Sequence, residues 1–203
     1  MTVPNVVVFD LGKVLLDFDY AIAVRKLLPR CTVNARQVQT LIDQSPLLFE
    51  IETGRITIGQ FFHQIQAATG FRGEADEFYA AFSDVFSPIP PMIELHAQLH
   101  ARNIPTYIFS NTNELATRHI RKNFPFFTQF DGYILSHEHG AMKPDAKLYE
   151  VVERDSGRRG ADILYLDDRE ENVVAGRQRG WQSIHHLAPE PTIVAIRAAG
   201  LLG

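Results

Sequence analysis

Short runs of apolar residues, each followed by polar or acidic residues, recur along the chain. Residues 6–9 (VVVF) lead into Asp10, residues 106–109 into Ser110, and residues 163–166 into Asp167 and Asp168; weaker runs occupy 132–135 and 183–187. Four successive apolar residues, of which three are β-branched, fit a strand that is buried on both faces. The pattern therefore predicts five strands, and three of them end in groups that carry chemistry.

Helical patterns separate these strands. Met92, Leu95, His96 and Leu99 follow helical spacing after Pro90 and Pro91, and Leu148, Tyr149 and Val152 form a stripe after Asp145; a third helix is expected from about Glu170 to near Gly180. Proline at a helix start, aspartate at an N-cap and glycine after a helix end are the usual boundary residues. Strands that alternate with helices predict an α/β fold, in which a parallel sheet is covered on both faces. In such sheets the ligand site lies beyond the carboxyl ends of the strands.

The stretch from about Leu16 to Ile89 shows no alternation of apolar and polar residues, and its apolar positions follow helical spacing. The candidate helix faces are Val24, Leu27 and Leu28; Val38, Leu41 and Ile42; Ile58, Phe61, Phe62 and Ile65; and Phe78, Phe82, Val85 and Phe86. Thr57 and Gln60 can form a capping box. The pattern predicts a helical bundle inserted after the first strand, with residues 87–91 (SPIPP) as a stiff return linker.

Composition narrows the possible functions of the chain. Its 203 residues contain 20 Lys and Arg against 24 Asp and Glu, for a net charge of −4, which disfavours nucleic acid or an anionic membrane as the partner. Cys31 is the single cysteine and cannot form an internal disulfide. No apolar run is long enough for a membrane span, and the N-terminus does not resemble a signal peptide. We therefore expect a cytoplasmic protein of undetermined oligomeric state.

Four motifs carry a family resemblance: FDLGKV at 9–14, IFSNT at 108–112, MKPD at 142–145 and LDD at 166–168. In this order they resemble the haloacid dehalogenase-like hydrolases, and residues 16–89 resemble the C1-type cap of the cap-bearing subgroup. The first motif is most similar to the branch that dephosphorylates α-glucose 1-phosphate. The resemblance implies a Rossmann-like core, residues 1–15 and 90–203, and a Mg²⁺-dependent phosphatase acting on a small phosphorylated metabolite, in particular a sugar phosphate.

The residue types at these motifs suit phosphate chemistry. An Asp carboxylate such as Asp10 can attack phosphorus to form an aspartyl-phosphate, which splits one hard step into two. Mg²⁺ prefers oxygen ligands, and Asp10 and Asp168 can supply them. The family resemblance adds the backbone carbonyl of Gly12 as a ligand, with Asp167 holding a metal-bound water.

The two middle motifs are expected to bind and stabilise the phosphate. The Ser110 hydroxyl and the backbone N–H groups around Asn111 can hold a phosphoryl oxygen at a helix start. Lys143 supplies a compact positive charge beside the phosphate and the nucleophile. Asp10, Ser110 and Lys143 are therefore the candidate catalytic residues, and Gly12, Ser110, Asn111 and Lys143 are the candidate substrate-binding residues.

Gly12 is a departure from the family pattern. Most phosphatases of the family carry an Asp there, which protonates the leaving oxygen and later activates water. Gly12 can do neither, so we expect a preference for activated esters, with a water, a cap side chain or a substrate hydroxyl as substitute. Cap candidates for substrate choice are Phe18, Asp19 and Tyr20, and residues 52–55 (ETGR).

Other interpretations of the same residues stay open at this point. A 2-haloacid dehalogenase uses the same Asp nucleophile without metal and also lacks the second Asp, although the adjacent acids Asp167 and Asp168 would repel a carboxylate substrate. A catalytically weak ligand-binding member of the family is the third possibility. Ser110 and Asn111 could simply cap the following helix, and Asp167 and Asp168 could simply lie at a helix N-terminus.

Overall fold

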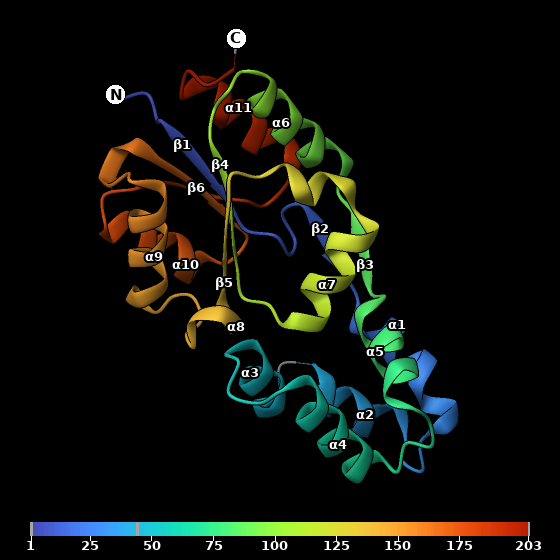
Figure 1. Cartoon of the computed structure of the whole chain (residues 1–203). Helices are drawn as coiled ribbons and strands as arrows, with labels where there is room; N and C mark the ends of the chain where they lie inside the picture. The colour runs from blue at the N-terminus through green and yellow to red at the C-terminus, as the bar shows by residue number, and fades with distance from the viewer. Residues whose placement is uncertain (1, 44, 203) are drawn as a thin grey trace.

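A computed structural model describes residues 2–43 and 45–202, so Met1 and Gly203, the ends of the predicted core segments, lie outside it (Figure 1). The larger part is a parallel sheet of order β5-β4-β1-β6-β7. Its strands are β1 (Val6–Phe9), β4 (Thr106–Ser110), β5 (Gly132–Leu135), β6 (Ile163–Asp167) and β7 (Gln182–His185). The predicted α/β fold is confirmed, and each of the five apolar runs forms a strand.

Helices cover both faces of this sheet, which makes its central strand fully buried. On one face lie α6 (Pro90–Ala101), α7 (Glu114–Asn123) and α11 (Pro189–Ala198), and on the other lie α9 (Ala146–Ser156) and α10 (Glu170–Gln178). Side chains of a strand alternate between faces. Accordingly Val7 and Phe9 pack into the first layer, whereas Val6 and Val8 pack into the second with Tyr149.

The boundary residues of the core helices behave as expected from the sequence. Pro90 and Pro91 open α6, and the carboxylate of Asp145 caps α9 by accepting from the Lys147 N–H at 2.9 Å. Helix α10 ends at Gln178, and Gly180 follows with a φ of +81°. The core also contains the short helix α8 (Ser136–His139) and the 3₁₀ helices Pro125–Gln129 and Gly160–Asp162, and a third 3₁₀ helix, Leu28–Arg30, lies outside the core.

A bundle of five helices lies beyond the carboxyl ends of the strands (Figure 1). The helices are α1 (Tyr20–Leu27), α2 (Ala35–Ile42), α3 (Pro46–Glu52), α4 (Ile58–Thr69) and α5 (Ala75–Ser83). Buried aromatic rings hold them together, with Phe61 and Phe82 5.1 Å apart between ring centroids. The predicted capping box of Thr57 and Gln60 is present at the start of α4. We call this bundle the cap.

Two short strands join the cap to the core, where the sequence predicts helix and linker. The strands β2 (Leu16–Phe18) and β3 (Phe86–Pro88) pair in antiparallel register. The predicted helix face that includes Phe86 is therefore wrong at that residue, which belongs to β3 instead of α5, and Leu16–Phe18 at the start of the predicted bundle is a strand. Three residues are too few to show an alternating pattern, and the pairing joins segments far apart in sequence. The division of the chain at 15/16 and 89/90 stays a prediction.

None of the helices in the described residues has both the length and the hydrophobicity that crossing a bilayer would require.

Candidate active site

Asp10 directly follows the central strand, where the carboxyl ends of three neighbouring strands meet. Its main-chain N–H donates to the Leu166 carbonyl at 2.8 Å, which extends the pairing of β1 with β6 by one residue. The carboxylate accepts from the Leu11 N–H at 2.6 Å and lies 3.0 Å from the Lys143 ammonium. Only 7% of the residue is exposed. The sheet therefore fixes a buried carboxylate at the position where α/β folds bind ligands.

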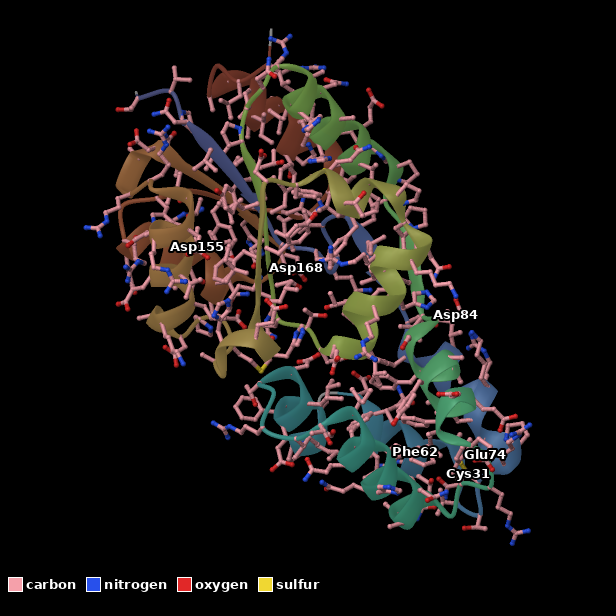
Figure 2. The ribbon with its side chains drawn as sticks, viewed as in Figure 1. Cys31, Phe62, Glu74, Asp84, Asp155 and Asp168 are labelled. Atoms are coloured by element: carbon pink, nitrogen blue, oxygen red, sulfur yellow. The ribbon has the colours of Figure 1, made fainter. Side chains whose placement is uncertain are left out.

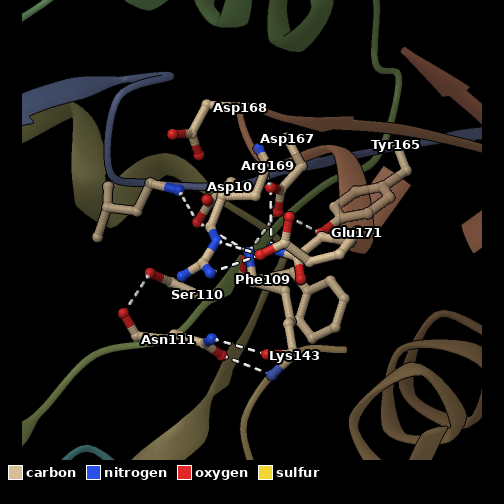
Figure 3. Close-up of polar contacts among 12 residues, drawn as sticks. Asp10, Phe109, Ser110, Asn111, Lys143, Tyr165, Asp167, Asp168, Arg169 and Glu171 are labelled. Atoms are coloured by element: carbon tan, nitrogen blue, oxygen red, sulfur yellow. Dashed lines mark hydrogen bonds and ion pairs between the residues drawn. The ribbon is translucent and has the colours of Figure 1, made fainter. Parts of the chain in front are cut away.

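Lys143 lies beside Asp10, and three oxygen atoms surround its ammonium group (Figure 3). They belong to Asp10 at 3.0 Å, Asp167 at 2.6 Å and the Phe109 carbonyl at 2.8 Å. Burial works to lower the pKa of Lys143, but the two carboxylates outweigh it and raise the pKa above its ordinary value. The lysine is therefore charged at neutral pH, and its three N–H donors are all engaged.

The Asn111 side chain positions Lys143. Its amide donates to the Lys143 carbonyl at 3.1 Å, and its oxygen accepts from the Lys143 N–H at 2.7 Å. The Asn111 side chain is therefore occupied, and the substrate-binding role expected of this residue stays a prediction, for which its backbone N–H is the group that remains. Neither Ser110 nor Asn111 caps the next helix, since Asn113 does so by accepting from Ala116 at 3.0 Å.

Asp167 is fully buried at the end of β6, and protein donors surround its carboxylate. One oxygen accepts from the Arg169 N–H at 2.8 Å and the Asn172 amide at 2.9 Å, and the other accepts from Lys143 and the Tyr165 hydroxyl. Burial works to raise the pKa of Asp167, but the Lys143 charge and these hydrogen bonds lower it. Asp167 is thus an ionised partner for Lys143, with little capacity left for another ligand.

Asp168 is partly buried, and the contacts described for it use its main chain. Its carbonyl accepts from the His185 ring at 2.8 Å. Oxygens of Asp10, Asp167 and Asp168 lie within 4.8 Å of one another. Burial and the neighbouring Asp167 charge raise the pKa of Asp168. Of these three acids, Asp10 and Asp168 keep oxygens that are free for a ligand.

The charges around Asp10 fit a divalent cation. Burial raises the pKa of Asp10 to about 8, with the Asp167 and Asp168 charges adding to the effect and Lys143 opposing it. The raised pKa means that this pocket disfavours the ionised form of Asp10, which is the form that acts as a nucleophile. A hard cation that prefers oxygen ligands would restore the ionised form. The Gly12 carbonyl oxygen also accepts no hydrogen bond from the described residues, so it is available to a cation.

Gly12 allows a close approach of an aromatic ring. A Cβ at this position would lie 2.9 Å from Cε1 of Phe18. The ring thus occupies space that a larger residue 12 would need, and the Lys13 ammonium lies 4.6 Å from the centre of the same ring. The same ammonium pairs with Asp17 and donates to the Phe18 carbonyl.

A cavity of about 190 Å³ opens above these groups, between the core and the cap. Its floor contains Asp10, Gly12, Ser110, Asn111, Lys143 and Asp168. The wall, as we call the opposite side, consists of Phe18, Tyr20, Asp43, Leu48, Glu52 and Phe86. The predicted site residues therefore lie around one cavity, except that Asp167 is buried beneath its floor.

Part of the cap prediction is wrong. Asp19 caps α1 by accepting from the Ala21 N–H at 2.8 Å, and Arg55 packs over the ring of Phe49 at 4.9 Å. Neither lines the cavity. Tyr165 and Asn172, which hold Asp167, are absent from the sequence-based candidates. The motif containing Asp167 gave no sign of either, although an even spacing along a buried strand puts Tyr165 and Asp167 on the same face.

Comparison with known proteins agrees with the arrangement of these groups. A family model for haloacid dehalogenase-like hydrolases matches residues 4–180. The chain belongs to this family. The resemblance drawn from the four motifs is confirmed at this level, while the proposed glucose 1-phosphate branch stays a prediction.

Two characterised relatives of this hydrolase cover nearly all of the chain. A sesquiterpene phosphatase, astK, from Aspergillus oryzae is 25% identical over 94% of this chain and 93% of its own. A D-ribitol-5-phosphate phosphatase from Bacteroides thetaiotaomicron is 23% identical over 87% and 89%. These names describe two different kinds of alcohol, one apolar and one polar.

Solved structures share the fold. A family enzyme from Bacteroides thetaiotaomicron, in complex with magnesium and inorganic phosphate, has a TM-score of 0.78 at 23% identity and covers 89% of this chain and 93% of its own. The L-2-haloacid dehalogenase of Xanthobacter autotrophicus has a TM-score of 0.62 at 20% identity, covering 89% and 76%. Both likenesses concern the fold.

Proposed function

We propose that this hydrolase is a Mg²⁺-dependent phosphatase that acts on a small phosphorylated metabolite through an aspartyl-phosphate on Asp10. The main observation is the buried Asp10 carboxylate, which has the Lys143 ammonium at 3.0 Å and a second free acid, Asp168, nearby. Two phosphatases among the relatives and a magnesium and phosphate complex among the structural neighbours support the proposal.

Oxygen ligands for Mg²⁺ are available on two sides of Asp10. Asp10 and Asp168 would bind it directly, the Gly12 carbonyl would complete the protein ligands, and Asp167 would contribute through water, because protein donors already occupy its oxygens. When bound, the ion would reduce the repulsion between the nucleophile and a phosphate dianion.

The residues of the floor account for the first step. A carboxylate oxygen of Asp10 attacks phosphorus, the bond from phosphorus to the ester oxygen breaks, and the electron pair leaves with that oxygen. Lys143 stabilises charge on the phosphoryl group from beside Asp10, and the buried Ser110 hydroxyl donates to a phosphoryl oxygen. In the second step water attacks the same phosphorus, which releases phosphate and restores the Asp10 carboxylate.

The floor leaves the alcohol part of the substrate undecided. The family resemblance favours a sugar phosphate, for which Asp43, Glu52 and the Tyr20 hydroxyl are the polar groups on the wall. A second candidate is the phosphate ester of an apolar alcohol, because Phe18, Leu48 and Phe86 contribute apolar surface to the same wall. The sesquiterpene phosphatase among the relatives is consistent with the second candidate.

A phosphate-release screen over sugar phosphates, acyl phosphates and apolar phosphomonoesters tests the proposal, run with Mg²⁺ and after complete chelation. We expect release that needs Mg²⁺ and falls at least ~10⁴-fold in Asp10→Asn, which removes the nucleophile. Asp155→Asn is the matched control, because Asp155 lies on α9 (Figure 2), pairs with Arg154 and does not line the cavity. Release that survives chelation would contradict metal dependence.

The two alternatives give different results in the same screen. A 2-haloacid dehalogenase would release halide in the presence of chelator, although the acids beside Asp10 would repel its carboxylate substrate. A ligand-binding member without activity would release neither phosphate nor halide, and Asp10→Asn would then have no turnover to remove.

A further inference from the structure

The proposed reaction needs a proton that the floor does not supply. The ester oxygen departs as an alkoxide unless an acid protonates it, and general acid–base assistance is typically worth ~10²–10⁴-fold. Gly12 has no side chain, and the Phe18 ring occupies the adjoining space. Lys143 is fully engaged with Asp10, Asp167 and Phe109. The proton therefore has to come from another part of the cavity.

The direction of attack identifies that part. In phosphoryl transfer the attacking and leaving oxygens are roughly in line, with phosphorus between them. Because Asp10 attacks from the floor, the leaving oxygen points away from the floor and toward the wall. The attacking water of the second step approaches from that same side. An acid on the wall could thus serve both steps.

Glu52 is on this wall, and the backbone around it is fixed against the core. It is the last residue of α3, and its carbonyl oxygen lies 2.6 Å from the Ser136 hydroxyl of α8. Two residues later Gly54 has a φ of +63°, and a Cβ there would lie 2.2 Å from the His137 carbonyl oxygen. Only glycine permits this approach, so α3 and α8 meet closely, and Figure 1 shows the two helices next to each other.

The carboxyl group of Glu52 lines the cavity without a fixed partner. Among the described residues it has no hydrogen bond or ion pair, and the nearest influence on it is the charge of Arg169, which itself pairs with Glu171 at 2.7 Å. Besides Asp10, Lys143 and Asp168 on the floor, the titratable groups on the cavity and on the helices packed against α3 are Lys13, Tyr20, Arg36, Asp43, His63, His137, Glu138 and His139. Burial raises the pKa of Glu52 to about 7, with Arg169 opposing the effect. Such a group exchanges protons readily near neutral pH.

We propose that Glu52 is the general acid and general base of this hydrolase, replacing from the cap the Asp that Gly12 lacks; this rests on the phosphatase function proposed above. As the ester bond breaks, the Glu52 carboxyl transfers its proton to the leaving oxygen, which gives a neutral alcohol and a Glu52 carboxylate. In the second step this carboxylate takes a proton from the attacking water. The bond between phosphorus and Asp10 then breaks, and both residues return to their starting states.

The test compares wild type, Glu52→Gln and Glu50→Gln in rapid-mixing experiments with two aromatic esters. p-Nitrophenyl phosphate has a leaving group that needs no proton, whereas benzyl phosphate has a similar size and a basic leaving oxygen. In Glu52→Gln we expect first-turnover alcohol release from benzyl phosphate to fall ~10²–10⁴-fold and the nitrophenol burst to change by less than about threefold. The burst is then followed by slow turnover, because the second step lacks its base.

Glu50→Gln is the matched control, because Glu50 lies on the same helix but does not line the cavity. It should match wild type with both esters, and both variants should keep the wild-type fold by circular dichroism. If Glu52→Gln slows first-turnover release equally with both esters, or does not slow it with benzyl phosphate, the acid–base role of Glu52 is overturned. The phosphatase function proposed above would be unaffected by either result. Phosphate release that survives in Asp10→Asn would instead overturn the function on which this role rests.

Discussion

The floor and the wall of the cavity differ in whether their buried charged groups have partners. On the floor, Lys143 has two carboxylates within 3.0 Å, and the buried Asp167 has four hydrogen-bond donors. On the wall, Glu52 lacks any such partner in the described part of the chain and shares the cavity with the apolar residues Leu48 and Phe86. Burying a charge is costly unless it is paired, and the floor meets this requirement whereas the wall does not.

This difference matches the two parts of a phosphate ester. The phosphoryl group is the same in every substrate, and a floor in which Lys143 is held by Asp10 and Asp167 would bind it in one geometry. The alcohol varies between substrates, and the cap supplies the surface that meets it. Burial of a carboxyl without a partner on that surface raises the pKa of Glu52, which allows this group to exchange a proton near neutral pH. The three predictions below test this contrast, starting with the largest effect.

The first prediction concerns the loss of the positive charge on the floor. Lys143→Met removes the positive charge and leaves Asp10 and Asp167 as uncompensated buried acids. We expect unfolding free energy to fall by about 3–5 kcal/mol and turnover to fall by ~10²–10³-fold. Denaturant titration and steady-state kinetics measure the two effects. Lys147→Met, at an exposed lysine on α9, is the control, and a stable Lys143 variant would show that the pairing on the floor is not needed.

The second prediction concerns stability when the ionisable group on the wall, Glu52, is replaced by a neutral one. The folded state raises the pKa of Glu52 from 4.5 to about 7, so the proton it binds stabilises the fold fully below pH 4.5. That contribution is lost as the pH rises through 7. Glutamine never ionises, so Glu52→Gln should be more stable than wild type at pH 8, by up to ~3 kcal/mol, and similar to it at pH 4.5.

Thermal or denaturant unfolding at the two pH values measures this difference. Glu50→Gln on the same helix should follow the wild-type pH dependence. If Glu52→Gln is less stable than wild type by the same amount at both pH values, Glu52 is not an unpaired carboxyl. Such a result would mean that the substitution removes a contact of the Glu52 side chain, and the loss of that contact does not depend on whether Glu52 is protonated.

The third and smallest prediction concerns the substrate. Tyr20→Phe removes one hydroxyl from the wall and keeps the ring, whose centroid lies 5.6 Å from that of the Phe82 ring. A sugar phosphate that uses this hydroxyl should lose about tenfold in kcat/KM, equivalent to one hydrogen bond. An apolar ester should change little. Competition between a sugar phosphate and an apolar ester distinguishes the two candidates, and no change with either would remove Tyr20 from substrate recognition.

Sequence predicts the floor better than the wall, for a physical reason. Asp10, Ser110 and Asp167 follow strands, and parallel strands bring their carboxyl ends together whatever else the chain does. Lys143 is placed by Asn111, whose two bonds to its backbone cross between distant segments and leave no pattern in sequence. The side-chain partners of Asp167 have a different explanation: Tyr165 and Asn172 lie only two and five residues away from it, but both lie outside the motif that contains it.

The wall depends on elements that are too short to predict. Helix α3 has seven residues, and its buried apolar pair, Leu48 and Ile51, spans only one turn, so Glu52 could be named only as one of several cap candidates. Its start does carry a signal, since Ser45 caps it and Pro46 follows at the first helical position. The strands β2 and β3 have three residues each, and tertiary pairing alone determines them.

Covalent phosphorylation of Asp10 tests the central claim most directly. Glu52→Gln mixed with p-nitrophenyl phosphate and Mg²⁺, then quenched in acid, should accumulate the intermediate, because the second step lacks its base. Peptide mass spectrometry should find one phosphoryl group on the peptide that contains Asp10, and none there in the Asp10→Asn variant. A phosphoryl group on another residue, or nitrophenol release with no covalent phosphoenzyme at any time, would contradict the aspartyl-phosphate mechanism.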